Sequence, residues 1–174
     1  MRQSLIVPFA YSFLFSFSPS VFAVEIITGF SPSGTAQTVV LDALNEAQHT
    51  IDLAAYSFTS KPVSLALLAA QKRGVVVRVL ADEKANSTQY TAVTFLANQG
   101  VPVRLIRHYQ IFHHKFAVID NKSVQTGSFN YSAAANKSNA ENVIYLRGSP
   151  AAAAAYTQEF NRRWAEGYTL NSRY

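Results

Sequence analysis

Residues 50–80 read TIDLAAYSFTSKPVSLALLAAQKRGVVVRVL, and this stretch decides the fold class. The segments 50–58 and 75–80 are short apolar runs with the length of a strand, and the second is rich in β-branched residues. Between them, apolar residues recur at the spacing of one helix face, at Val63, Ala66, Leu67 and Ala70. Strand, helix and strand in this order predict parallel strands that a helix connects.

The same alternation continues outward from this stretch in both directions. Towards the N-terminus, residues 24–30 have the pattern of a strand and residues 36–47 that of a helix. Towards the C-terminus, a short helix is expected over 89–98 and a strand over 101–106. This order predicts one domain of the α/β class, a layered α/β/α sandwich with a mixed, largely parallel sheet flanked by helices.

The second half of the chain is expected to add strands and a final helix to the same domain. Residues 112–119 and 122–126 have the pattern of two strands joined by a tight turn at Asp120-Asn121, and residues 142–146 that of a third. Ser149 is suited to cap a final helix. One face of that helix carries Ala152, Tyr156, Phe160 and Trp164. We expect its aromatic residues to pack in the core rather than to stack on bases.

The first residues have the features of a secretory signal peptide. Arg2 supplies a positive charge, an apolar run follows over 5–17, and Ala23 is a small residue at a candidate cleavage position. We therefore predict a signal peptide over 1–23 and a single folded domain over 24–174. A periplasmic or secreted location is expected, with no stable membrane insertion after cleavage. A retained anchor is the alternative, although the apolar run is short for a membrane span.

The composition favours an anionic partner and excludes cysteine chemistry. The chain carries 15 basic and 10 acidic residues, a formal net charge of +5. This excess favours nucleic acid or another polyanion through phosphate neutralisation. The chain contains no cysteine, which excludes thiolate metal sites and a cysteine nucleophile. Nor do carboxylates and histidines occur at the spacing of metal ligands, so no metal and no cofactor are expected.

His113 and Lys115 are the leading candidates for chemistry. In a strand, alternate side chains share a face, so both are expected on one face and His114 on the other. A lysine supplies a fixed positive charge for phosphate oxygens, and an imidazole acts as nucleophile or proton donor near neutral pH. The alternative is a solvated strand end. For His114 and His108 we favour ordinary packed or surface histidines.

A second group of candidates follows the next expected strand. Gly127 allows the backbone to approach an anion, while Ser128 and Asn130 offer neutral hydrogen-bond donors. Glu141 is a candidate partner for one nitrogen of His113, a contact that fixes the orientation of an imidazole. Backbone capping by Ser128 and Asn130, and an exposed carboxylate at Glu141, are the alternatives.

The remaining polar residues near these candidates are expected to be structural or solvated. Asp120 has the opposite parity to His113, which favours a role in bracing the turn and neighbouring backbone amides. Asp82-Glu83 is taken as a pair of acidic loop residues rather than a metal site. Solvated charge is the expectation for Arg104, Arg107 and Lys122, and contact with a polyanion is the alternative.

The spacing of these residues resembles a known signature. His113-x-Lys115, four residues, Asp120, six residues and Gly127-Ser128-x-Asn130 are similar to the H-x-K-x4-D-x6-G-S-x-N motif of the phospholipase D superfamily. A looser resemblance to its small exported bacterial endonucleases covers most of residues 24–174. It includes the stretch 55–59, Ala-Tyr-Ser-Phe-Thr, and the segment at Glu141.

The resemblance implies a mechanism and an assembly. Members need two motifs per active site and this chain has one, so a homodimer with a shared active site is implied. His113 of one subunit would attack phosphorus and form a phosphohistidine, and His113 of the other would protonate the leaving group and then activate water. Lys115, Asn130 and Ser128 would hold the phosphate oxygens, and Glu141 would orient His113. This scheme requires no metal.

Three functions remain in competition from the sequence. The first is a metal-independent, non-specific endonuclease acting on DNA and possibly RNA. The second is a phospholipase D-type hydrolase of phospholipid head groups. The third is a non-catalytic nucleic-acid-binding module, against which the intact His113, Lys115 and Asn130 argue.

Overall fold

The computed structural model describes residues 23–88 and 91–172, so nearly all of the expected signal peptide lies outside the described residues. The strands in chain order are β1 (Glu25–Ser31), β2 (Thr50–Ala55), β3 (Val76–Asp82), β4 (Val103–Ile106), β5 (Lys115–Ile119), β6 (Ser123–Gly127), β7 (Glu141–Arg147) and β8 (Tyr168–Thr169). The helices are α1 (Thr35–Asn45), α2 (Lys61–Lys72), the 3-10 helix η1 (Lys84–Asn86), α3 (Ala92–Asn98), α4 (Ala133–Lys137) and α5 (Pro150–Glu166).

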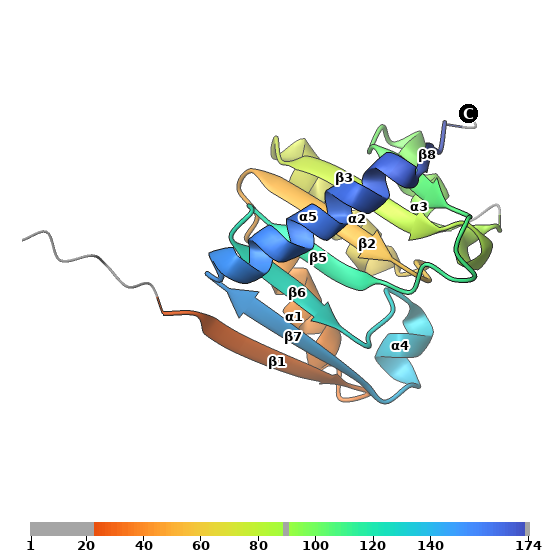
Figure 1. The fold of residues 1–174 in the computed structure, drawn as a ribbon. Coiled ribbons are helices and arrows are strands. Elements are labelled where there is room, and N and C mark those ends of the chain that lie inside the picture. The colour runs from red at the N-terminus through yellow and green to blue at the C-terminus, as the bar shows by residue number, and fades with distance from the viewer. Residues whose placement is uncertain (1–22, 89–90, 173–174) are drawn as a thin grey trace, which may run out of the picture.

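One sheet of eight strands, in the order β1-β7-β6-β5-β2-β3-β4-β8, forms the middle layer. The layered sandwich and its mixed sheet are confirmed, but the parallel share is smaller than expected. Only β2–β3 and β3–β4 pair in parallel, and the other five neighbouring pairs in the described chain are antiparallel. The reason is that the β5–β6 hairpin and β7 lie between β2 and β1. The two early strands therefore never become neighbours (Figure 1).

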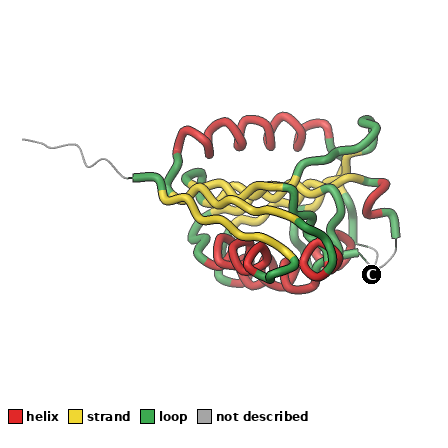
Figure 2. The backbone as a smooth tube through the Cα atoms, turned by 90° about the horizontal axis from the view of Figure 1, so that it is seen from below, coloured by secondary structure: helices red, strands yellow, loops and turns green. Residues whose placement is uncertain are grey.

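The helices cover the two faces of the sheet unequally. Figure 2 shows one long helix on one side of the strands and the shorter helices on the other. The single helix is α5, which crosses the front of the sheet in Figure 1. Helices α1, α2 and α3 share the opposite face. For α2 and α3 the reason is that the crossovers β2-α2-β3 and β3-α3-β4 continue in one direction along the sheet with the same hand.

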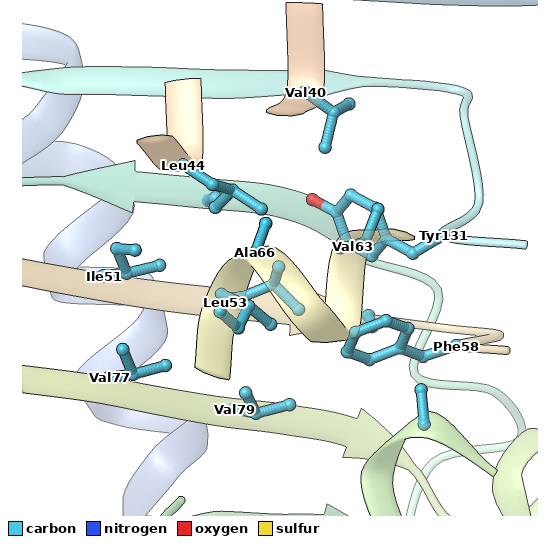
Figure 3. Packing of buried hydrophobic residues seen from close by; sticks show 14 of the residues in the cluster. Val40, Leu44, Ile51, Leu53, Phe58, Val63, Ala66, Val77, Val79 and Tyr131 are labelled. Atoms are coloured by element: carbon cyan, nitrogen blue, oxygen red, sulfur yellow. The ribbon is translucent and has the colours of Figure 1, made fainter. Parts of the chain in front are cut away.

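The main core lies between the sheet and the helices α1 and α2. Val40 and Leu44 of α1 and Ile51 and Leu53 of β2 belong to this core, and all four are fully buried. Figure 3 shows Val63 and Ala66 of α2 in the same layer. Fully burying a residue of this size contributes roughly 1.5–3 kcal/mol. Packing on this face therefore holds β2 rigidly, and β2 leads into the candidate site.

The second core confirms the expected face of the last helix. Phe160 is fully buried under α5, with Tyr156 and Trp164 packed beside it. The Phe116 ring of β5 meets the Tyr156 ring edge-on, with centroids 4.9 Å apart. Ser149 stands at the N-cap position as expected, although its side chain makes no capping hydrogen bond. Phe160 is therefore a core residue, and Tyr156 and Trp164 are partly buried against this core.

Several element boundaries differ from the sequence expectation, such as the end of β2 at Ala55 rather than at residue 58, and two of them have a visible local cause. Strand β5 begins at Lys115 rather than at residue 112, because the Phe112 amide donates to the Asp82 carboxylate instead of to a neighbouring strand. Helix α3 begins at Ala92, where Thr91 caps it by accepting from the Thr94 amide. Residues 89 and 90, the expected start of this helix, lie outside the described residues. The short elements η1, α4 and β8 were not expected from the sequence.

Among the residues that the structure describes, no helix is both long and apolar enough to cross a membrane.

Candidate active site

The candidate residues converge at one edge of the sheet because of the strand directions. Strands β2 and β3 run antiparallel to β5, so their carboxyl ends lie beside the start of β5. Strand β6 runs back along β5 and ends there, and β7 begins there. This edge therefore brings together residues from five strands. They are Tyr56 directly after β2, Asp82 at the end of β3, Lys115 at the start of β5, Gly127 at the end of β6 and Glu141 at the start of β7.

His113 and Lys115 both lie against one aromatic ring, that of Tyr56. The imidazole of His113 meets the Tyr56 ring edge-on, with centroids 4.8 Å apart. The Lys115 ammonium lies 5.2 Å from the centroid of the same ring. Its Nζ also donates to the His113 carbonyl at 2.9 Å. The expectation that the two side chains face the same way is met, even though His113 precedes the regular strand.

The protonation of both groups is shifted by their surroundings. Desolvation lowers the pKa of His113, as do the Lys115 ammonium and His114, while the Asp82 carboxylate raises it. Burial lowers the pKa of Lys115, and the Glu141 carboxylate raises it. A lowered imidazole pKa increases the fraction of neutral, nucleophilic His113 at neutral pH. The Lys115 side chain is only 7% exposed, so its charge acts where water screens it weakly.

Glu141 orients Ser128 within one chain. The Ser128 hydroxyl donates to Glu141 Oε2 at 2.6 Å and accepts from the Asn142 amide at 3.0 Å. The other carboxylate oxygen of Glu141 accepts from Asn139 Nδ2 at 3.0 Å. No hydrogen bond joins Glu141 to His113 in the described part of the chain. Orientation of His113 by Glu141 therefore stays a prediction.

Gly127 is required by a close backbone approach. A Cβ atom at this position would stand 2.2 Å from the Asn142 carbonyl oxygen, and the φ of Gly127 is +149°. The amides of Ser128 and Phe129 donate to this same carbonyl. The glycine thus lets the segment carrying Ser128 and Asn130 fold against the start of β7. The Asn130 Oδ1 atom is buried without a partner in the described chain.

Asp120 lies at the other end of β5. Five residue steps along a strand separate it from Lys115, which is about 17 Å. Its carboxylate accepts from the amides of Gln48 at 2.9 Å, His49 at 2.7 Å and Thr50 at 2.8 Å. Asp120 and Asn121 both have positive φ and are the central residues of the turn that the Lys122 amide closes by donating to the Ile119 carbonyl. Asp120 therefore braces the hairpin turn against the start of β2, the structural role expected from its parity.

His114 points towards α5, opposite to His113. Its Nε2 lies 3.1 Å from Glu159 Oε1, and Arg163 pairs with the same carboxylate at 2.7 Å. A cleft of about 370 Å³ opens on this side, between α5 and the start of β5. It is lined by His113, His114, Lys115, Phe116, Thr126, Gly127, Ala155, Tyr156 and Glu159. The cleft therefore connects His113 with the side of α5.

Other charged candidates are structural. Arg104 donates to the Trp164 carbonyl at 2.7 Å, and the Arg107 guanidinium lies 5.1 Å from the Tyr168 ring centroid. His108 Nε2 lies 3.2 Å from Glu166 Oε2. The described residues contain no group of three or more metal-ligating side chains.

Two residues of this edge, Tyr56 and Asp82, are not among the candidates that the sequence predicts. Tyr56 lies in the stretch 55–59, which carries part of the family resemblance, and this position is a signal for it. The sequence predicts a loop carboxylate at Asp82, whereas Asp82 is 2% exposed at the end of β3. Its place at the carboxyl end of a predicted parallel strand is also a signal, because functional side chains gather there in α/β sheets.

A family model described as "Cardiolipin synthase, PLD-like domain" matches residues 40–164, which include every motif residue. The chain belongs to the phospholipase D superfamily. The match spans well over half of the chain and confirms the resemblance carried by residues 113–130. Together with the edge geometry, it identifies a phospholipase D-like hydrolase.

Individual relatives within the phospholipase D superfamily agree with this assignment. The solved structure of a phospholipase D family member, Nuc from Salmonella typhimurium, superposes with a TM-score of 0.84 at 36% identity, covering 86% of this chain and 100% of that one. A phospholipase D of Rickettsia conorii is 32% identical over 139 residues, which are 80% of this chain and 70% of that protein. A mitochondrial cardiolipin hydrolase of Xenopus tropicalis is 35% identical over 71% of this chain and 58% of that protein.

Proposed function

We propose that the chain is a metal-independent phosphodiesterase that cleaves nucleic acid through a phosphohistidine intermediate. The observation that carries the proposal is the placement of His113 and Lys115 against the same ring, that of Tyr56, at the edge that also holds Ser128 and Glu141. A neutral imidazole beside a buried ammonium suits attack on an anionic diester. The net charge of +5 and the similarity to Nuc support nucleic acid as the substrate.

The proposed reaction takes place in a homodimer and has two steps. In the first, a ring nitrogen of His113 forms a bond to phosphorus while the bond to the leaving oxygen breaks, and His113 of the second subunit donates its proton to that oxygen. In the second, the now neutral histidine takes a proton from water as its oxygen bonds to phosphorus and the P–N bond breaks. Lys115, Ser128 and Asn130 hold the non-bridging oxygens, which carry the developing charge.

The first test uses residues 24–174, the proposed mature and exported form, with plasmid DNA in excess EDTA. We expect nicking by the wild type, and its loss in His113→Ala. His49→Ala is the matched control, since His49 is exposed at the start of β2, at the opposite edge of the sheet. If folded wild-type protein leaves DNA intact, the nuclease proposal is wrong. Tight DNA binding without turnover would instead favour a non-catalytic binding module.

A phospholipid head group is the second candidate substrate. The relatives named phospholipase D and mitochondrial cardiolipin hydrolase favour it, and the same His113 chemistry would cleave either diester. Turnover of cardiolipin vesicles and of DNA by the same preparation separates the two. Faster hydrolysis of the vesicles would make the lipid the substrate.

A further inference from the structure

The end of β3 holds the segment that carries His113. Asp82 Oδ2 accepts a hydrogen bond from the Phe112 amide at 2.8 Å, and Oδ1 accepts from the Ala85 amide at 2.8 Å. The Asp82 side chain is 2% exposed, so these bonds face little competition from water. Because Phe112 directly precedes His113, the Asp82 carboxylate fixes where the backbone of the nucleophile begins.

Asn86 of η1 connects the same region to Tyr56. Its Nδ2 donates to the carbonyl oxygens of Tyr56 at 2.6 Å and Asp82 at 2.8 Å. Its Oδ1 accepts from the Phe58 amide at 3.0 Å. Asn86 is 4% exposed, and one buried amide therefore ties together the chain segments that follow β2 and β3. The Tyr56 ring that packs against His113 is held by this connection.

We propose that Asp82 and Asn86 are positioning residues for His113, Asp82 acting through the Phe112 amide and Asn86 acting through the Tyr56 backbone. This inference rests on the proposed role of His113 in the reaction. Neither residue belongs to the motif over residues 113–130, and both lie on elements that precede it in the chain. A misplacement of about 1 Å at a reacting group lowers a rate by roughly 100-fold, so a fixed backbone at Phe112 matters for catalysis.

The charge of Asp82 acts on the pKa of His113, and this effect can be measured. Among the groups that face His113, desolvation, Lys115 and His114 lower its pKa, and Asp82 raises it. Tyr56 packs edge-on against the ring. Glu141 acts on Lys115 instead, and Glu159 pairs with His114. Since one imidazole must be nucleophile in one subunit and acid in the other, a pKa near the working pH serves both steps.

The test compares Asp82→Asn with Glu83→Gln, which removes the neighbouring and less buried carboxylate. NMR titration of ring-labelled histidines and the pH dependence of diester cleavage are measured on the same samples. In Asp82→Asn we expect the pKa of His113 to fall, the pH–rate profile to move to lower pH, and kcat at pH 7 to drop about 10- to 100-fold with KM within about twofold. Glu83→Gln is expected to match the wild type.

Two further variants keep the proposal testable if Asp82→Asn does not fold. Asp82→Glu keeps the charge but displaces the carboxylate, so kcat should fall while the pKa of His113 stays near that of the wild type. Asn86→Ala should change the ring chemical shifts of His113, because the Tyr56 ring moves, and should lower kcat. The proposal would be overturned by two results found together. The folded Asp82 variants would keep the His113 titration and the kcat of the wild type, and Asn86→Ala would keep the His113 chemical shifts and kcat. A folded wild type that cleaves no diester refutes the proposed function instead, and the NMR titration still reports on Asp82.

Discussion

Asp120 shows how a motif residue can serve the fold rather than the chemistry. Replacing it with alanine removes the acceptor of three backbone amides, those of Gln48, His49 and Thr50. A hydrogen bond to a charged group contributes about 1.5–3 kcal/mol when buried. Because Gln48 and His49 are exposed and water can replace part of the loss, we expect Asp120→Ala to lower the free energy of unfolding by about 2–4 kcal/mol. Asp120→Asn keeps one acceptor oxygen and should cost about half as much.

The stabilisation that the Asp120 carboxylate contributes depends on pH in a direction that its pKa shift fixes. Burial alone would raise the pKa of Asp120, but the three backbone amides outweigh it, and the pKa is lowered. A lowered folded-state pKa means that the stabilisation is present above the unfolded pKa and is lost as the pH falls through the folded pKa. The difference in stability between wild type and Asp120→Asn should therefore be largest near pH 7 and shrink below the usual titration range of aspartate.

Urea unfolding at pH 7 and at stepwise lower pH measures both effects. Asp42→Asn is the matched control, because Asp42 is an exposed aspartate on α1, and it should change stability by less than about 0.5 kcal/mol. At 25 °C, folded Asp120→Asn should retain cleavage within a few-fold of wild type, since Asp120 lies about 17 Å along β5 from Lys115. Unchanged stability combined with lost cleavage would refute the reasoning and place Asp120 in the chemistry.

Two further variants test the edge geometry. Gly127→Ala brings a Cβ to 2.2 Å from the Asn142 carbonyl oxygen. We expect the free energy of unfolding, measured by thermal unfolding, to fall by about 2–5 kcal/mol, and cleavage to be lost because Ser128 and Asn130 move. A melting temperature equal to that of the wild type would contradict this. Tyr56→Phe keeps the ring against His113 and should stay within about twofold of wild-type kcat, whereas Tyr56→Ala should lose roughly 10- to 100-fold in steady-state kinetics. Equal rates for the two Tyr56 variants would show that the ring does not position the imidazole.

Local patterns predicted most elements, because each depends on residues close in sequence. The helix that carries Val63 and Ala66 and the β-branched strand at Val79 are present as expected. In each, the spacing of the apolar residues fixes which conformation turns them towards the core. The short elements α4 and β8 had no such periodicity. The prediction of a largely parallel sheet was wrong because strand pairing joins segments that are distant in the sequence. The β5–β6 hairpin pairs antiparallel with β2, and no local pattern indicates this.

The sequence by itself determined the family, and it predicted His113 and Lys115 as the leading candidates for chemistry and a structural role for Asp120. These follow from fixed identities at fixed spacing and from the alternation of side chains in a strand, both of which are local. Only the tertiary structure decided which carboxylate lies near His113 in one chain. Glu141 contacts Ser128, while Asp82, buried at the end of β3, holds the Phe112 amide. That choice depends on how β3 and β5 are placed across β2, and no spacing along the chain encodes it.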